Sequence, residues 1–419
     1  EALFEKVKFI DADTLKEQTS LQEKIGHYVM CRFLPARLLK TLVCNTHSPN
    51  NTAAILFSSG SEGTPKGICL SHQNIMANVK QTASVLNMES DDIIFGNLPL
   101  FHAFGLTVTQ FLPLLESVPV VYHPDPTDAL TCAKTIAKHQ ATIMFGTSTF
   151  FRLYCKNKKI HPLMLQSLRI AVSGAEKLNA DIRTAFNSKF SIDIYEGYGA
   201  TETTPVASVN IPDKLSLQDF KVQLGNKTGS VGMPLPGTSC KIVDIKTHAE
   251  LPTGEAGMIL VGGSQVMQGY LNQPEKTDDV IVNINEQRWY ITGDKGYIDT
   301  DGFLFILDRY SRFAKIGGEM VSLSMVEASY REAIHTLLQI DDYELAATNI
   351  PDDKKGERIV ILSTIDLNKK FTAEQLNSFG LNNLAIASAY FTVDTLPKLG
   401  TGKIDLSTLK KQAKALISI

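Results

Sequence analysis

The 419-residue chain is 43% hydrophobic and 20% charged, a globular composition and a length that predicts two or three domains. Its formal net charge of −3 lacks the basic excess of a general nucleic-acid binder, so we expect no nucleic-acid partner. The six cysteines form no CxxC pair and have no metal-type spacing with histidine, which excludes a cysteine-based metal site. We therefore expect reduced, mostly buried thiols in a cytoplasmic protein.

The first half of the chain alternates short apolar strands with helices. A helical pattern over residues 28–42 comes first, and Ser71 and Ala129 mark the starts of two later helices. Apolar strands are predicted over residues 53–57, 92–98, 118–122, 142–145 and 168–172. Such alternation predicts a mainly parallel sheet with helices on its faces, and ligands at the carboxyl ends of its strands.

One uncharged stretch, residues 97–115, invites a test for a membrane span. It contains Pro99, His102 and Gly105, and polar groups of this kind are costly in lipid. We therefore predict a buried or pocket-lining segment rather than a span.

The second half changes character near residue 225. Glycines and prolines separate short alternating segments there, including residues 239–245 and 258–261, and predict a β-rich subdomain. A mixed pattern then follows: a helix over 325–336, strands over 344–350 and 357–365, and a final helix over 406–419. The predicted fold class is α/β: a large N-terminal α/β domain with mainly parallel sheets and a β-rich subdomain, plus a small, mobile α+β C-terminal domain.

A glycine-rich loop directly after the first apolar strand is the clearest chemical signal. Its hydroxyls, backbone N–H groups and one lysine can wrap phosphate oxygens. The candidate contacts are Ser58, Ser59, Gly60, Ser61, Gly63, Thr64 and Lys66. A plain turn is the alternative, while a Walker loop is excluded because Pro65 stands where a glycine must precede the lysine. The loop resembles the phosphate-binding signature of the adenylate-forming superfamily of acyl-CoA synthetases, luciferases and adenylation domains, although Glu62 replaces the usual threonine.

Further segments resemble that superfamily in the same order along the chain. Residues 197–202 resemble its second nucleotide motif. The resemblance implies that Tyr198, next to Gly199, stacks on adenine, that Thr201 contacts the α-phosphate and that Glu202 holds Mg²⁺. Without this context, Glu202 would be read as a solvated surface residue.

Two more segments complete the predicted nucleotide site. Gly174, Ala175 and Glu176 resemble the backbone strip against which adenine packs, and an ordinary turn is the alternative. Asp294 lies in a segment that resembles the ribose motif, and Arg309 is expected to reach the ribose or a phosphate. Surface charges are the alternative interpretation of these two side chains.

The remaining motifs concern the acyl group and domain movement. His102 falls in a segment that resembles the acyl-pocket motif, and the alternative for it is a satisfied core histidine. Lys403 aligns with the family's catalytic lysine on a glycine-rich loop, and Arg312 with its interdomain hinge. The predicted boundaries are an AMP-binding domain that lacks its first part, a hinge and a small C-terminal domain: residues 1–308, 309–316 and 317–419.

The sequences of the loop and of the hinge most resemble those of one subgroup, the acyl-ACP synthetase half of the bacterial bifunctional 2-acylglycerophosphoethanolamine acyltransferases. In that subgroup Glu62 is expected. The resemblance implies that ATP and Mg²⁺ activate a fatty acid, whose acyl group then passes to acyl carrier protein. Alternatives are coenzyme A as the acceptor, which makes the protein a fatty or aryl acyl-CoA ligase, or a nucleotide- or acyl-binding fragment without turnover.

The short N-terminal region leads us to expect either a fragment of a longer protein or a truncated member. Only 57 residues precede Ser58, and the acyltransferase half is missing. In the full-length protein that half would carry a peripheral association with the cytoplasmic face of the membrane. Lys410, Lys411 and Lys414 on the last helix are candidates for docking an acidic carrier, with a solvated helix face as the alternative.

Overall fold

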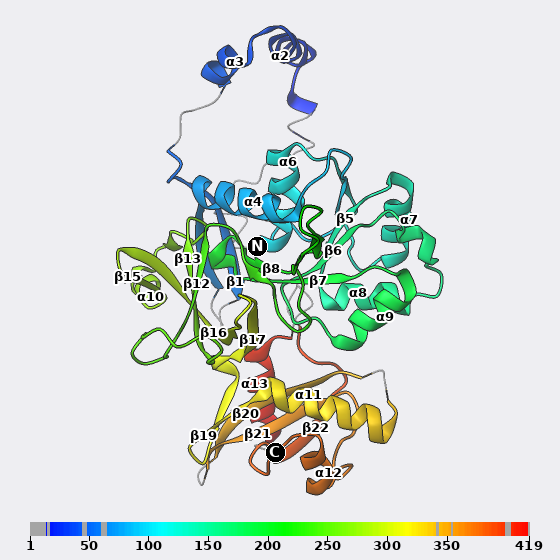
Figure 1. Ribbon diagram of the computed structural model, residues 1–419, viewed down its shortest axis with the longest axis vertical. Helices are drawn as coiled ribbons and strands as arrows, with labels where there is room; N and C mark the ends of the chain where they lie inside the picture. The colour runs from blue at the N-terminus through cyan, green and yellow to red at the C-terminus, as the bar shows by residue number, and fades with distance from the viewer. Residues whose placement is uncertain are drawn as a thin grey trace. The chain divides into compact units, whose positions relative to one another are not determined.

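The computed structural model describes residues 14, 17–43, 48–59, 65–340, 343–352, 355–398 and 404–417. Residue contacts divide the chain into two units, residues 1–51 and 52–419. The first contains helices α2 (Leu21–Phe33) and α3 (Ala36–Val43), where the sequence predicts a single helical pattern (Figure 1). The helices are separate because Leu34 is extended, as the residue before a proline prefers to be.

The second unit begins with a hairpin around the glycine-rich loop. Strand β1 (Thr52–Ser59) pairs antiparallel with β2 (Pro65–Ser71), and β14 (Gly269–Tyr270) completes this three-stranded sheet. The sequence did not predict β2, because Pro65 and Gly67 are unfavourable in strands. The lack of a side chain on Gly67 allows close packing in this strand, since a Cβ there would lie 3.1 Å from the Cβ of Leu271 and 3.4 Å from Ile55. The loop residues Gly60, Ser61, Gly63 and Thr64 lie outside the described residues.

A seven-stranded sheet forms the centre of the second unit, with the strand order β11-β8-β7-β6-β5-β3-β4. The five strands from β7 to β4 are parallel to one another, whereas β8 pairs antiparallel with β7 and β11 pairs antiparallel with β8. The strands are β3 (Ile94–Gly96), β4 (Val120–Tyr122), β5 (Ile143–Gly146), β6 (Ile170–Ser173), β7 (Ile194–Gly199), β8 (Val206–Val209) and β11 (Met233–Pro234). The predicted parallel sheet is confirmed.

Helices cover both faces of this sheet (Figure 1). On one face α4 (His72–Leu86), the π-helical turn η1 (Leu106–Phe111) and α6 (Leu112–Glu116) share a core with Ile94 and Ile143. Helices α7 (Ala129–His139), α8 (Ser148–Lys156) and α9 (Ala180–Phe190) cover the other face. Side chains that alternate along each strand supply both cores, as expected of a sheet buried on both sides. Ser71 is confirmed as the N-cap of α4, and α7 spans the predicted residues.

A β-rich subdomain follows, as predicted. Its antiparallel sheet has the order β12-β13-β16-β15, and β17 pairs with β16. The strands are β12 (Thr238–Val243), β13 (Gly257–Gly263), β15 (Ile281–Ile284), β16 (Gln287–Ile298) and β17 (Leu304–Arg309). The two-residue strands β9 (Lys214–Leu215) and β10 (Val222–Gln223) form a separate hairpin, and the short helix α10 (Pro274–Asp278) follows β14.

The C-terminal region packs helices on both faces of a second mixed sheet. Its strands are β18 (Phe313–Ile316), β19 (Glu319–Ser322), β20 (Leu345–Asp352), β21 (Gly356–Ser363) and β22 (Ala389–Thr392). One core joins the sheet to α11 (Leu323–Ala333), the π-helical turn η5 (Ile334–Leu338) and α12 (Ala373–Ser378), and another joins it to α13 (Leu406–Ile417). Leu409 and Ala413 are buried on α13, whereas Leu406 is exposed, which narrows the predicted apolar face.

The structure corrects the expectation about the thiols and agrees with the buried segment predicted over residues 97–115. Among the five cysteines in the described part of the chain, Cys132 is buried and Cys31 is exposed, so the thiols are not mostly buried. The uncharged segment 97–115 forms α5 (Ala103–Gly105), η1 and α6 rather than one helix. None of the helices described is long and apolar enough to cross a membrane.

Candidate active site

Two groups of polar side chains lie at the carboxyl end of strand β7 and in the turn that follows it. The first contains Tyr198, Asp294 and Arg309. The Tyr198 hydroxyl donates to Oδ2 of Asp294 at 2.6 Å, and Nε of Arg309 donates to Oδ1 at 2.9 Å. Asp294 is 2% exposed, so this carboxylate is held by a hydroxyl and a guanidinium in a nearly dry place.

Burial and charge change the proton affinities in this first group. Burial, followed by the charge of Asp294, raises the pKa of Tyr198 well above its usual value. The carboxylate of Asp294 raises the pKa of Arg309 further. The tyrosine therefore stays a neutral donor and the arginine a cation over the physiological range.

The second group contains Glu202, Tyr270 and Lys66. Glu202 lies in the short 3₁₀ turn η3 (Thr201–Thr203) that follows β7, and its Oε1 accepts a 2.9 Å hydrogen bond from the Tyr270 hydroxyl. The Lys66 ammonium lies 5.3 Å from the centre of the Tyr270 ring. Burial, followed by the charge of Glu202, raises the pKa of Tyr270, so this hydroxyl is also a donor.

Tyr290 on β16 is 6% exposed and interacts electrostatically with both groups. Burial raises its pKa well above the usual value, and the groups that raise it further are Glu202, Tyr270, Tyr198 and Asp294. One buried tyrosine is therefore within electrostatic reach of both carboxylates. The predicted adenine, ribose and metal residues consequently lie near one another, although 96 positions separate Tyr198 from Asp294.

The predicted adenine strip follows β6. Ala175 has a positive φ of 70°, and Oε1 of Glu176 accepts a 2.6 Å hydrogen bond from the backbone N–H of Thr149 in the first turn of α8. A Cβ on Gly174 would lie 3.0 Å from the Phe104 ring. Glycine is therefore required for Phe104 to pack this closely.

His102 lies at the start of the segment between β3 and β4. Its Nδ1 accepts a 3.2 Å hydrogen bond from the backbone N–H of Phe104, which caps α5. Gly105 allows the close turn here, since a Cβ would lie 2.2 Å from the carbonyl oxygen of Pro99. This capping contact involves no residue of the groups around Asp294 and Glu202. The acyl-pocket role of His102 stays a prediction.

Other predicted site residues are placed only in part. Ser58 pairs with Lys66 across the β1–β2 hairpin, whereas only the backbone of Ser59 is described. The predicted catalytic residue Lys403 lies outside the described residues. Arg312 lies between β17 and β18, where its Nη2 donates to Oε1 of Glu327 at 2.6 Å.

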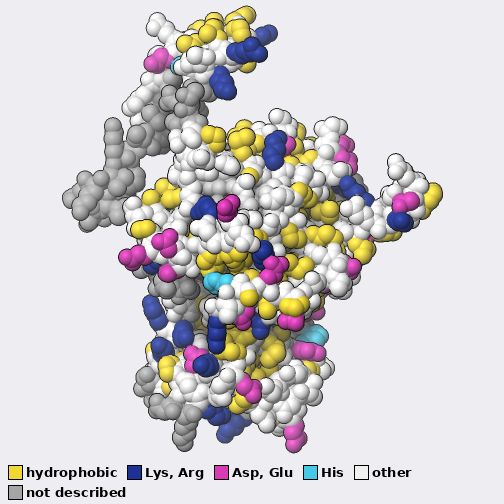
Figure 2. All heavy atoms as spheres, turned by 60° about the vertical axis from the view of Figure 1, so that its left-hand side comes forward, with side chains coloured by type: hydrophobic (Ala, Val, Ile, Leu, Met, Phe, Trp, Pro, Cys, Tyr) yellow, Lys and Arg dark blue, Asp and Glu magenta, His cyan; other side chains and the backbone are white. Residues whose placement is uncertain are grey.

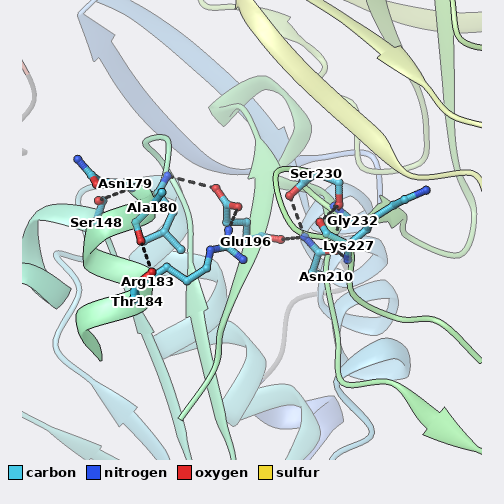
Figure 3. A network of polar contacts seen from close by, with 11 residues as sticks. Ser148, Asn179, Ala180, Arg183, Thr184, Glu196, Asn210, Lys227, Ser230 and Gly232 are labelled. Carbon is cyan, nitrogen blue, oxygen red and sulfur yellow. Dashed lines mark hydrogen bonds and ion pairs between the residues drawn. The ribbon is translucent and has the colours of Figure 1, made fainter. Parts of the chain in front are cut away.

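A buried network holds the strand that carries Tyr198. Figure 3 shows Glu196 on β7 between Arg183 of α9, with which it forms an ion pair, and Asn210. The backbone N–H of Asn210 donates to the Glu196 carbonyl at 2.8 Å. Burial raises the pKa of Glu196, while Arg183 opposes that shift. These contacts fix the strand two residues before Tyr198.

Sequence reasoning missed Tyr270 and its contact with Glu202. The two residues are 68 positions apart, and the pair Gly269-Tyr270 carries no spacing that points to a carboxylate. The only available signal was an aromatic residue beside a glycine, which is common in turns and strand ends.

The described residues fit a nucleotide and a divalent cation. Oε2 of Glu202 has no hydrogen-bond or ion-pair partner among the residues described, and Lys66 has no carboxylate partner among them. A single carboxylate beside phosphates is a common Mg²⁺ arrangement, and no group of three potential metal ligands occurs in the described part of the chain.

Comparison with known proteins assigns the family. A profile described as AMP-binding enzyme matches residues 4–271, more than half of the chain. The chain belongs to the AMP-binding enzyme family. A long-chain-fatty-acid–CoA ligase of Bacillus subtilis is 31% identical over 85% of this chain and 61% of its own length. One from Escherichia coli is 29% identical over 88% and 63%.

Solved structures of AMP-binding enzymes share the fold. ATP-bound MatB from Rhodopseudomonas palustris superposes with a TM-score of 0.73 and 27% identity, over 88% of this chain and 70% of that one. The o-succinylbenzoate CoA synthetase MenE of Bacillus subtilis, in complex with an acyl-adenylate intermediate, gives 0.70 and 26% over 87% and 70%. The predicted fold class is thus confirmed. The chain spans about three fifths of the length of these curated relatives.

Proposed function

We propose that this protein uses ATP and Mg²⁺ to activate a fatty acid as its acyl-adenylate and then passes the acyl group to the phosphopantetheine thiol of acyl carrier protein. The observation that carries the proposal is the pair of groups around Asp294 and Glu202, both near Tyr290. Membership in the AMP-binding enzyme family supports the first half-reaction. The sequences of the hinge and of the glycine-rich loop resemble those of acyl-ACP synthetases, which supports the carrier protein as acceptor.

In the first half-reaction a fatty carboxylate oxygen attacks the α-phosphorus, and the bond to the pyrophosphate oxygen breaks with its electron pair. Asp294 and Arg309 would bind the ribose and Tyr198 would face adenine. Lys66, Thr201 and Lys403 would stabilise the charge that develops on the phosphate oxygens. Glu202 would hold Mg²⁺, which supplies neutralising charge when bound.

In the second half-reaction a thiol attacks the acyl carbonyl and AMP leaves. Both half-reactions would use one site, so the residues after the hinge at Arg312 would rotate between them. Residues 1–308, 309–316 and 317–419 remain our proposed domain, hinge and C-terminal domain.

A second candidate is an acyl-CoA ligase, which the names of the long-chain-fatty-acid–CoA ligases and MenE favour. A third is a fragment that binds nucleotide without turnover, which is favoured because this chain covers only 61% of the length of the Bacillus subtilis relative.

Thioester formation from a fatty acid and ATP, measured with holo-acyl carrier protein and with CoA in parallel, separates the two acceptors. Reversal of the exposed Lys411 by Lys411→Glu should raise KM for the carrier and leave KM for ATP unchanged.

The decisive experiment is ATP–pyrophosphate exchange with Mg²⁺ and a series of fatty acids. Exchange should require a fatty acid and should fall about 100-fold or more in Lys403→Ala, the size expected for losing one group that stabilises transition-state charge. ATP binding without exchange for any acid would contradict the enzyme proposal and support the binding fragment.

A further inference from the structure

Tyr270 contacts two residues that the proposed function assigns to the phosphates. Its hydroxyl donates to Oε1 of Glu202 at 2.9 Å, and its ring lies under the Lys66 ammonium at 5.3 Å. It is 7% exposed, whereas Glu202 and Lys66 are partly buried. No motif had singled it out.

The backbone around Tyr270 fixes where this side chain points. Strand β14 pairs with β2, which places Tyr270 opposite Ile68, and the N–H of Leu271 donates to the Gly67 carbonyl at 2.7 Å. Gly269 has a φ of 154°, and a Cβ there would lie 2.8 Å from Thr277. Thr277 in turn accepts a 2.9 Å hydrogen bond from the N–H of Tyr270.

A backbone contact anchors the other end of the same arrangement. The N–H of Met267 donates to the carbonyl oxygen of Glu202 at 2.8 Å. Segment 267–270 therefore forms two hydrogen bonds with Glu202: Met267 donates to its backbone carbonyl and Tyr270 donates to its side chain. The hydroxyl occupies Oε1 and leaves Oε2 without a partner among the described residues.

We propose that Tyr270 is a positioning residue, which orients the Glu202 carboxylate toward a divalent cation and seats Lys66 beside the same phosphate group. The inference rests on the proposed function, since it takes the bound group to be a magnesium nucleotide. A carboxylate that must turn to meet the cation loses rotamer freedom on binding, and the hydroxyl removes that cost in advance. The ring contact likewise holds the long Lys66 side chain in place.

Two substitutions separate these roles. Tyr270→Phe removes the hydroxyl and keeps the ring, so ATP binding in EDTA should be unchanged. The Mg²⁺ concentration that gives half of the stimulation of ATP binding should rise about tenfold, the effect of losing one hydrogen bond to a charged group. Tyr270→Leu removes the ring as well, and should also weaken ATP binding in EDTA about fivefold through Lys66.

Calorimetric titration of ATP at several Mg²⁺ concentrations provides the readout, with thermal unfolding of each variant alongside. Tyr122→Phe is the matched control: its hydroxyl bonds to Thr109 and Gln110, and β4 is the strand at the far end of the sheet order. It should leave both the EDTA and the Mg²⁺ arms unchanged. In a Glu202→Gln background, Tyr270→Phe should have no further effect on the Mg²⁺ arm.

The outcomes distinguish this inference from the proposed function. Equal Mg²⁺ dependence in the parent and in Tyr270→Phe would overturn the positioning role, and so would an equal loss in EDTA and in Mg²⁺. A Tyr270→Phe effect that persists in the Glu202→Gln background would also overturn it. Fatty-acid-independent or absent exchange, with the Mg²⁺ shift still present, would overturn the enzyme proposal and leave the positioning role supported. A parent protein whose ATP binding does not respond to Mg²⁺ would overturn both.

Discussion

The carboxylate of Asp294 is shared by side chains from two other strands. Tyr198 comes from the end of β7 and Arg309 from the end of β17, and each takes one oxygen. The carboxylate is buried, and these two donors fix its orientation. A ribose hydroxyl that replaced either donor would bond to a carboxylate oxygen of Asp294 that is already shielded from water.

Asp294→Asn should weaken ATP binding about tenfold, since an amide retains one acceptor but loses the charge that holds Arg309. Calorimetry measures the change. Asp301→Asn is a suitable control, because Asp301 is half exposed and its ion pair with Lys227 lies on the surface. Unchanged ATP affinity in a folded Asp294→Asn protein would refute the ribose assignment.

In the central sheet, a structural ion pair lies at the amino ends of the strands, and candidate site residues lie at their carboxyl ends. At the amino ends, Asp92 accepts from Arg169 at 2.8 Å, from Thr142 at 2.7 Å and from the N–H of Glu89 at 2.6 Å. These contacts tie together the starts of β3, β5 and β6. Among the candidate site residues, Gly174 to Glu176 follow the carboxyl end of β6 and Glu202 follows that of β7. Changes at Asp92 should therefore affect folding and leave nucleotide contacts in place.

Asp92 predicts a defined dependence of stability on pH. Burial alone would raise its pKa, but the hydrogen bonds, first among them that from Arg169, hold the pKa below the usual 3.8. The ionised carboxylate therefore stabilises the fold above pH of about 4, and this contribution is lost as pH falls through the lower folded pKa. Asp92→Asn should lower the free energy of unfolding by about 3 kcal/mol at pH 7, and by progressively less in acid.

Denaturant unfolding at several pH values between neutral and about pH 3 measures the difference between parent and variant. A difference that does not shrink in acid would show that the carboxylate charge is not the source of the stability.

Gly199 sits where β7 turns into η3. A Cβ there would lie 1.7 Å from the carbonyl oxygen of Pro205, a backbone atom that cannot swing aside. Gly199→Ala should therefore lower the thermal midpoint and displace the turn that carries Glu202, at a cost of about 2 kcal/mol or more. Gly26→Ala is the contrasting variant, because that helical glycine has nothing within 4 Å of its Cβ position. It should be neutral or slightly stabilising.

Across the whole second unit, Arg312 links the chain after β17 to the C-terminal sheet. Glu327, which accepts its 2.6 Å hydrogen bond, also accepts the N–H of Ala347 at 2.8 Å and is 6% exposed. Over the face shown in Figure 2, Lys and Arg side chains are interspersed with Asp and Glu, in keeping with the near balance of charge. Arg312 is thus held by one buried carboxylate, that of Glu327, and not by a cluster of surface charges.

Arg312→Ala should leave Glu327 buried without its cation and destabilise the protein by about 3 kcal/mol. If Arg312 is also the hinge, thioester formation should fall by a larger factor than pyrophosphate exchange. Single-turnover measurement of both half-reactions, below the unfolding temperature of the variant, tests this. Equal loss in both half-reactions would contradict the hinge role and leave only the structural one.

Much of the architecture could be predicted from local patterns. Strands β1 and β13, helix α7 and the N-cap at Ser71 depend on hydrophobic periodicity and on capping within a few residues, which are visible in the sequence. The segments that resemble nucleotide motifs are visible for another reason: each is a short contiguous string, and its role stays a prediction. Strand β2 was missed because proline and glycine obscured its pattern.

The sequence by itself determined the order of elements, the alternation that produces a parallel sheet, and the residue types available to a nucleotide. Only the tertiary structure decided which of them meet. Tyr198 with Asp294, Arg169 with Asp92 and Tyr270 with Glu202 are 96, 77 and 68 positions apart. Such pairs form because strand order and register bring distant chain segments together, and no local propensity encodes the few ångströms on which a hydrogen bond depends.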